Sequence, residues 1–388
     1  MRAHVPPGKA LAGSHASRGS GPVAPRWDAP TTPRPGTHDT FFRLPGILPD
    51  FIGQNRSRTY GAGLDPFAYE RVTSGLDDLH DWPAAFVRAA RDHLADGERY
   101  EGRGAVRSAG EAYRRAARWF HCAVLLPHPD REATAHAAAQ ADAAMGRALA
   151  LLEPDAVRIE DASYAGWLRG AGSGRGGGGG GVVVVVPGLD SSKEEFHDVT
   201  EALLARGSAV FTMDGPGQGV RAATTTVTSE YEHVLTRLVD ALHERLGPVP
   251  VGVVGLSLGG YYAALGAARE PRIRAAVTVS GPYRLTGWDD TVPFVRETLT
   301  QRAGSRDAAR KFLAGVDLRG TAGRIAVPLL VVDGADDAIP GVENGERLAA
   351  EAPHGIYHSV PGGDHLLGNV REQWLPGAAD WLAGQLTG

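Results

Sequence analysis

The chain has 388 residues, carries a net charge of −5 and has a pI near 6.3. This length suffices for one large domain or two ordinary ones, and the acidic balance gives no basic surface for nucleic acid or an anionic membrane. The single cysteine, Cys122, excludes an internal disulfide and a cysteine-rich metal site. The chain begins without an apolar run of signal-peptide length, and no later segment is long enough to cross a membrane, so we expect a cytosolic protein.

The composition of the sequence changes near residue 40 and again near residue 154. Residues 1–40 are rich in Pro, Gly, Ser and Ala, so they lack the apolar surface needed to offset ordering entropy, and we expect a disordered tail. Residues 41–154 are expected to form a helical domain, since apolar residues such as Tyr113, Ala117 and Phe120 recur at spacings of three and four.

After Pro154 the apolar period changes to two, and strands then alternate with helices to the end of the chain. Five consecutive valines, 182–186, are typical of a strand that is buried on both faces of a parallel sheet. The glycine run 171–181 lacks the Lys-Ser/Thr of a phosphate loop and precedes this strand, so we interpret it as a hairpin connection. The pattern predicts an α/β fold, a doubly wound and mostly parallel sheet, over residues 155–388.

The residues Gly255-Leu256-Ser257-Leu258-Gly259 fit the G-x-S-x-G pattern of a nucleophile elbow. They follow the β-branched run at 251–254 and precede a segment rich in small residues, as expected for a strand, a sharp turn and a helix. The alternative is a glycine turn with an incidental serine. Ser257 is therefore the candidate nucleophile, provided that a base and an acid lie elsewhere in the chain.

A candidate acid and a candidate base both follow Ser257 along the chain, in the order Ser, Asp, His that accompanies a nucleophile elbow. The segment LLVVDGADDAIP ends a predicted strand and presents Asp337 as the favoured acid, with Asp336 as the alternative. His365, in a glycine-containing loop after the last strand, is the favoured base. His358 is its competitor, but it lies within the predicted strand, where we expect its side chain to pack.

An oxyanion needs two positioned donors. The backbone N–H of Leu258 follows the nucleophile directly, and we expect Leu189, in the segment PGLDSSKEE after the five valines, to supply the second. A structural alternative is that Asp190, Ser191 and Ser192 cap the next helix, with Glu194 or Glu195 completing a capping box.

Four stretches, PGLDSSKEE, DGPGQG, GLSLGGYYAA and SGPY (280–283), together resemble one branch of the α/β-hydrolases. That branch contains 2,6-dihydroxypseudooxynicotine hydrolase and the fungal hydrolases that shorten polyketide chains in pigment synthesis. The resemblance covers residues 60–388 and implies a triad of Ser257, Asp337 and His365, with Leu189 and Leu258 as oxyanion donors. It also implies a helical cap, a pocket between the two domains and a homodimer.

The sequence departs from the branch in two places. Val220 stands after DGPGQG, where an acidic residue is frequent, and the extra carboxylate of some members has no secure counterpart. Asp289 or Asp290, beside Trp288, is the candidate for that carboxylate, and Trp288, Asp289 and Tyr283 are the candidate pocket residues in that region.

The leading hypothesis is a cofactor-independent serine hydrolase that cleaves a C–C bond next to a carbonyl, or an ester, in an aromatic or polyketide-type small molecule. Two alternatives stay open. One is an acyltransferase or cyclase that uses the same acyl-enzyme, and the other is a non-catalytic binding protein with the hydrolase fold.

Overall fold

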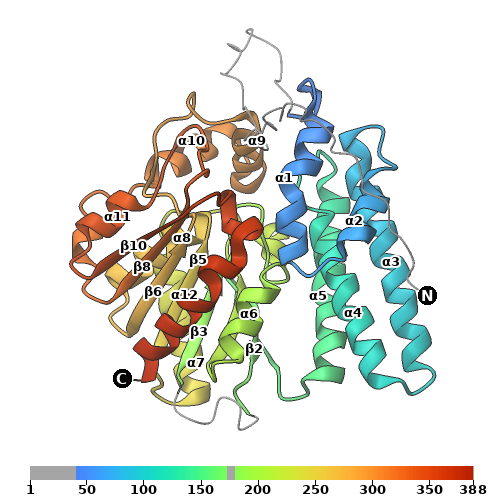
Figure 1. Ribbon diagram of the computed structural model, residues 1–388, viewed down its shortest axis with the longest axis horizontal. Coiled ribbons are helices and arrows are strands. Elements are labelled where there is room, and N and C mark those ends of the chain that lie inside the picture. The colour runs from blue at the N-terminus through green and yellow to red at the C-terminus, as the bar shows by residue number, and fades with distance from the viewer. Residues whose placement is uncertain (1–40, 173–179, 388) are drawn as a thin grey trace, which may run out of the picture.

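The computed structural model describes residues 41–172 and 180–387. The expected tail over 1–40 and most of the glycine run therefore lie outside the described residues. Within the described part, helices occupy residues up to 152, and a sheet covered by helices follows (Figure 1).

The N-terminal region is built from helices that pack side by side on one side of the sheet (Figure 1). Asp65 and Asp130 begin two of these helices, because each carboxylate accepts a backbone N–H of the first turn. The core of the region is aromatic, with Trp82 stacked on Phe86 at 4.1 Å between ring centroids. The helices are α1 (Ile47–Gly61), α2 (Pro66–Thr73), α3 (Trp82–Glu101), α4 (Val106–Cys122) and α5 (Arg131–Leu152).

Eight strands in the described part of the chain form one sheet in the order β1-β2-β4-β3-β5-β6-β8-β10. The five valines are strand β3 at its centre, and all of them are at most 1% exposed. β1 and β2 are antiparallel to their neighbours, and the other pairs are parallel. The strands are β1 (Val157–Glu160), β2 (Ala165–Arg169), β3 (Val182–Val186), β4 (Ala209–Asp214), β5 (Val251–Leu256), β6 (Ile273–Val279), β8 (Leu329–Gly334) and β10 (Gly355–Val360).

Helices cover both faces of this sheet, which confirms the predicted doubly wound α/β fold. One face packs against α6 (His197–Leu204) and α12 (Arg371–Thr387), and both helices lie in front of the strands in Figure 1. The other face packs against α7 (Glu232–Leu246), α8 (Leu258–Arg269) and α11 (Glu346–Glu351). Because the parallel strands share one direction, the loops that follow them meet at a single edge.

The segment between β6 and β8 belongs to the sheet part of the chain and packs against the helical region. It contains α9 (Pro293–Ala303), α10 (Arg306–Gly315) and a short strand β7 (Arg284–Leu285), which pairs with β9 (Val342–Glu343). Phe294 of α9 lies with its ring 5.2 Å from the ring of Phe41, within the apolar core of the helical region. The two parts are therefore packed against each other at the edge of the sheet where the candidate site lies.

Candidate active site

Ser257 occupies a sharp turn between β5 and α8. Its backbone has φ 54° and ψ −128°, a conformation that costs a non-glycine residue roughly 1–3 kcal/mol. A Cβ at Gly255 would lie 1.9 Å from the Gly259 carbonyl oxygen, and one at Gly259 would lie 2.2 Å from the Val186 carbonyl oxygen. Both glycines are therefore required, and the turn holds the serine at the carboxyl end of its strand.

The structure brings Ser257, His365 and Asp337 together in one chain of hydrogen bonds. His365 Nε2 lies 2.9 Å from Ser257 Oγ, and His365 Nδ1 lies 3.0 Å from Asp337 Oδ2. An ionised carboxylate only accepts hydrogen bonds, so Nδ1 carries the imidazole proton and Nε2 is free to accept the serine hydroxyl proton. This arrangement can convert a weak hydroxyl nucleophile into a reactive one.

The fold distinguishes the acid, Asp337, and the histidine, His365, from their sequence competitors. The Asp337 side chain is 2% exposed and faces the imidazole, whereas Asp336 is exposed and only its backbone N–H bonds inward, to Gly363. His358 lies on β10, the last strand of the sheet, and is exposed to solvent. The expectation that His358 packs inside is wrong, because an edge strand has no neighbour to cover its side chains there.

The charges of the histidine and the acid stabilise each other. Burial acts to lower the pKa of His365, but the Asp337 carboxylate and its hydrogen bond outweigh it and hold the pKa above the ordinary value. Burial acts to raise the pKa of Asp337, and the same contact outweighs it in the opposite direction. Asp337 is thus ionised at neutral pH, and its carboxylate can stabilise a protonated His365.

Strained backbone surrounds this cluster. Among the described residues, the four non-glycine residues with positive φ are Ser257, Ser280, Leu366 and Leu367. Ser280 Oγ accepts the Leu366 N–H at 3.0 Å, so the turn after β6 supports the loop that carries His365. Strain of this kind persists where surrounding contacts over-determine the conformation, and it concentrates at functional sites.

The loop that carries Leu189 lies against Ser257. A Cβ added to Gly188 would come within 3.0 Å of Ser257 Cβ, so glycine permits the close approach. The side-chain amide of Gln218 donates to the carbonyls of Pro187 (2.6 Å) and Gly188 (3.1 Å) and so holds the loop in place. Gln218 belongs to the DGPGQG turn, and its role was not predicted from the sequence.

The chain is similar to known hydrolases. A family model described as "Serine aminopeptidase, S33", one of the α/β-hydrolase families, matches residues 180–306. The chain is 32% identical over 205 residues to 2,6-dihydropseudooxynicotine hydrolase of Paenarthrobacter nicotinovorans, covering 51% of this chain and 56% of that protein. It is 31% identical over 246 residues to hydrolase acrC of Aspergillus aculeatus, covering 54% and 57%. The aligned part thus spans somewhat more than half the length of these curated relatives.

The solved structures extend the likeness over most of the chain. The crystal structure of 2,6-dihydroxy-pseudo-oxynicotine hydrolase superposes with a TM-score of 0.75 at 27% identity, covering 85% of this chain and 95% of that one. The chain has the α/β-hydrolase fold. AbyA5, with a TM-score of 0.62 at 19% identity and coverage of 87% and 98%, shares the fold. The predicted resemblance to this branch of the α/β-hydrolases is confirmed.

Helix α1 holds the loop that carries Leu189. Arg58 binds Glu195 through two nitrogens (2.6 and 2.9 Å), Asp190 at 2.7 Å and Ser191 at 3.1 Å. Its side chain is 14% exposed and that of Glu195 is 3% exposed, so the pair is largely removed from water. The signal in the sequence was weak, because 132 residues or more separate the arginine from its partners.

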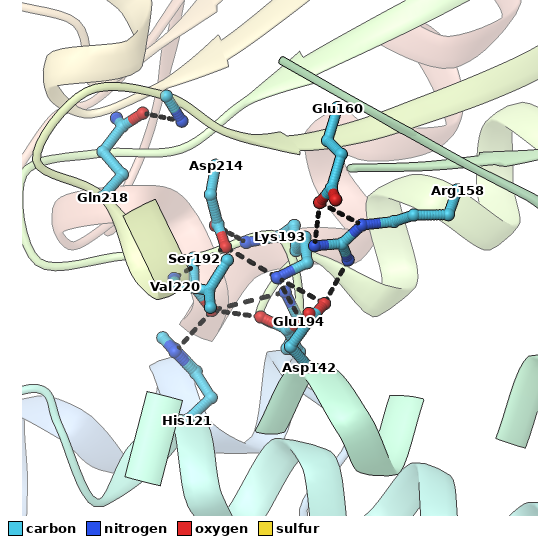
Figure 2. Close-up of polar contacts among 11 residues, drawn as sticks. His121, Asp142, Arg158, Glu160, Ser192, Lys193, Glu194, Asp214, Gln218 and Val220 are labelled. Carbon is cyan, nitrogen blue, oxygen red and sulfur yellow. Dashed lines mark hydrogen bonds and ion pairs between the residues drawn. The ribbon is translucent and has the colours of Figure 1, made fainter. Parts of the chain in front are cut away.

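Two further residues of the helical region reach the same loop (Figure 2). His121 of α4 lies 3.0 Å from Glu195 and 2.8 Å from Ser192 Oγ. The ammonium group of Lys193 lies 2.6 Å from Asp214 at the end of β4 and 2.8 Å from Glu194 in its own loop. It also lies 3.1 Å from Asp142 of α5, which belongs to the helical region. Burial acts to lower the pKa of Lys193, but these carboxylates outweigh it and raise the pKa.

These contacts show that the segment after β3 does not cap the next helix, so the structural alternative for this segment is wrong. Helix α6 begins only at His197, with Phe196 at its N-cap and no side-chain cap. Asp190 and Ser191 instead bind Arg58, and Ser192 binds His121 and Glu194. The loop is therefore fixed by contacts with the helical region.

The loop that carries His365 also contacts α1. Ser57 Oγ donates to Asp364 Oδ2 at 2.7 Å, one residue before the histidine. Helix α1 thus bonds to both loops that flank Ser257.

The three candidate pocket residues have different environments. Tyr283 is fully buried, and its hydroxyl donates to the carboxylate of Glu351 at 2.8 Å, so it serves packing and does not line the site. Trp288 is partly buried, with the guanidinium carbon of Arg310 5.5 Å from its ring centre. Asp289 is exposed. In the described residues, none of the three is hydrogen-bonded to the triad.

Two further findings concern ligands and membranes. Within residues 41–172 and 180–387, no group of three or more His, Cys, Asp or Glu side chains is arranged to hold a metal ion. In the same part of the chain, none of the helices combines the length and the apolar character needed to cross a bilayer.

Proposed function

We propose that this α/β-hydrolase cleaves a C–C bond adjacent to a carbonyl, or an ester, in an aromatic or polyketide-type small molecule through an acyl-enzyme on Ser257. The observation that carries the proposal is the bonded series Ser257–His365–Asp337 at 2.9 and 3.0 Å. The names of the relatives support the reaction class, since they include 2,6-dihydropseudooxynicotine hydrolase and 20-hydroxy-prefusarin hydrolase.

The reaction begins when Ser257 Oγ attacks the substrate carbonyl and passes its proton to His365 Nε2. The backbone N–H groups of Leu258 and Leu189 hold the resulting oxyanion. When the oxyanion collapses, the bond to the leaving carbon or oxygen breaks. The imidazolium protonates the departing enolate carbon or alkoxide, and the acyl group stays on the serine.

Water then completes the cycle. His365 takes a proton from water, the hydroxide attacks the acyl carbonyl, and the serine oxygen leaves with the proton that the imidazolium returns. Asp337 keeps the imidazole oriented and balances its charge throughout, without accepting the proton itself.

A fluorophosphonate probe tests the serine directly. We expect a covalent adduct on Ser257 of the folded protein and none on Ser257→Ala. A panel of aryl ketones, 1,3-diketones and aryl esters then tests the reaction class, with the carboxylic acid product identified by mass spectrometry. Absence of an adduct on folded wild-type protein would overturn the proposal in favour of a binding protein.

Product analysis in the presence of a competing alcohol or amine separates hydrolysis from acyl transfer. We expect the free acid to predominate. Transfer products in excess of the acid would make the protein an acyltransferase. The homodimer that the sequence resemblance implies is also a proposal, and light scattering coupled to size exclusion tests it.

A further inference from the structure

Ser192 lies between two ionisable side chains in the buried contact between α4 and the loop after β3 (Figure 2). Its Oγ is 2.8 Å from His121 Nδ1 on one side and 2.8 Å from Glu194 Oε2 on the other. All three residues are at most 3% exposed, so bulk water does not compete for these contacts. His121, Ser192 and Glu194 are called the buried trio below.

The second ring nitrogen of His121 carries a proton. Nε2 lies 3.0 Å from Oε2 of Glu195. Burial acts to raise the pKa of Glu195, but Arg58 and the hydrogen bond from His121 outweigh it and hold the pKa well below the ordinary value. An ionised carboxylate only accepts hydrogen bonds, so Nε2 is protonated and donates to Glu195.

The single hydroxyl proton of Ser192 cannot serve both of its contacts. If the hydroxyl donates to Glu194, Oγ must accept from His121 Nδ1, and the imidazole then carries two protons. If the hydroxyl donates to Nδ1, Oγ must accept from Glu194 Oε2, and the carboxyl group is then protonated. Both arrangements contain one proton more than a neutral imidazole with an ionised glutamate. Without that proton, two lone pairs would face each other across 2.8 Å.

The charged groups around the trio do not replace this proton. In the described residues, the other donor to Ser192 Oγ is the backbone N–H of Glu194 at 3.3 Å. Across a small cavity beside Glu194, burial lowers the pKa of His197 to about 3, so that imidazole is neutral. The charged residues that face the trio are Lys193 and Glu195 of the same loop, Asp214 of β4, Asp142 of α5, Arg58 of α1 and, across the cavity, Arg118 of α4.

We propose that His121, Ser192 and Glu194 share one proton, and that this proton holds the loop that carries Leu189 against the helical region. His121 and Glu194 are then positioning residues for the oxyanion site, a role that rests on the proposed acyl-enzyme function. Gly188 of the same loop lies against Ser257. When the proton is lost, one of the two contacts of Ser192 becomes repulsive, and the loop loosens beside the nucleophile.

NMR of protein labelled with ¹⁵N-histidine and ¹³C-glutamate tests the shared proton directly. The spectra are recorded at about pH 8, above the ordinary pKa values of both side chains. The signals are assigned by their absence in His121→Gln and Glu194→Gln. We expect either a doubly protonated His121 or a protonated Glu194. A neutral His121 together with an ionised Glu194 would overturn the proposal.

The dependence of stability on pH is a second test. The unfolded chain releases its protons as the pH passes the ordinary values of glutamate and histidine, whereas the folded trio keeps one, so the stability that it contributes is lost as the pH rises above that range. Glu194→Gln removes this dependence, because its amide donates to Ser192 Oγ at every pH. From about pH 7 to about pH 9, the Tm of the wild type should fall by at least about 2 °C more than that of the variant.

Glu111→Gln is the matched control for this substitution. Glu111 lies on α4 like His121, but its side chain is 45% exposed and pairs with Arg107. This variant should keep the pH dependence of the wild type. Equal pH dependence in the wild type and Glu194→Gln contradicts the shared proton. If Glu194→Gln does not fold, the NMR measurement on the wild type decides.

The rate at which a fluorophosphonate labels Ser257 tests the positioning role. On the alkaline side of its maximum, the wild-type rate should fall at least about threefold as the oxyanion loop loosens, whereas Glu194→Gln should keep its maximal rate. A decline of equal size in both proteins would show that the trio does not position the loop. If the wild type is not labelled at any pH, the proposed function fails, and the NMR and Tm measurements still decide whether the trio holds the proton.

Discussion

Replacing Arg58 by methionine tests whether the helical region takes part in building the oxyanion site. The change leaves the buried carboxylate of Glu195 and the nearby Asp190 without their cation. Removing one partner of a buried ion pair costs about 3 kcal/mol, which corresponds to a fall in Tm of about 6 °C or more. The loop that holds the Leu189 amide beside Ser257 then loses its main attachment to α1.

The effect on catalysis should exceed the effect on substrate binding. Loss of one oxyanion donor reduces kcat by about 100-fold, and we expect Arg58→Met to approach this value with little change in KM. Burial and the Arg58 cation both act to lower the pKa of His365. Removing the cation should therefore raise that pKa and move the acid limb of the kcat/KM profile to higher pH, which a merely structural role would not do.

The measurements are steady-state kinetics on the best substrate of the panel and the rate of fluorophosphonate labelling of Ser257. Arg56→Met is the matched control on the same helix, since its guanidinium pairs with Glu70 and both side chains are at least half exposed. That variant should change stability by less than about 0.5 kcal/mol and leave labelling unchanged. Arg58→Met with a labelling rate within about twofold of wild type would refute the reasoning, because even a small displacement of the loop should cost more.

Four further outcomes follow from the site. Ser257→Ala should abolish turnover while circular dichroism and Tm stay close to wild type. Asp337→Asn should lower kcat by about 10⁴-fold; it removes the partner that raises the pKa of His365, so the acid limb should move to lower pH, and an unchanged limb would exclude this assignment. In the wild type, His365 must be neutral to accept a proton, and its pKa lies above the ordinary histidine value. Activity should therefore fall as the pH drops through that raised pKa. Gln218→Leu releases the carbonyls before Leu189 and should reduce kcat about 10-fold with the fold retained, whereas full activity would show that the loop is held by other contacts.

Local rules explain which parts of the site could be predicted from the sequence. The glycines of the pentapeptide mark the turn at Ser257: Gly255 is required by the Gly259 carbonyl within the same turn, and Gly259 is required by the Val186 carbonyl of β3. The five valines likewise marked a buried central strand. The segment between β6 and β8 carried no such mark: Tyr283, assigned there to the pocket, is buried and its hydroxyl bonds to Glu351, 68 residues further along the chain.

The sequence by itself determined the alternation of strands and helices, the elbow, and the order of serine, acid and histidine, because these features follow from short-range backbone sterics and apolar periodicity. Only the tertiary structure decided between Asp336 and Asp337 and showed that Arg58 and His121 hold the loop beside the nucleophile. The physical reason is that an ion pair depends on distance in space. Partners from different elements meet only after the sheet has formed and the helices have packed against it.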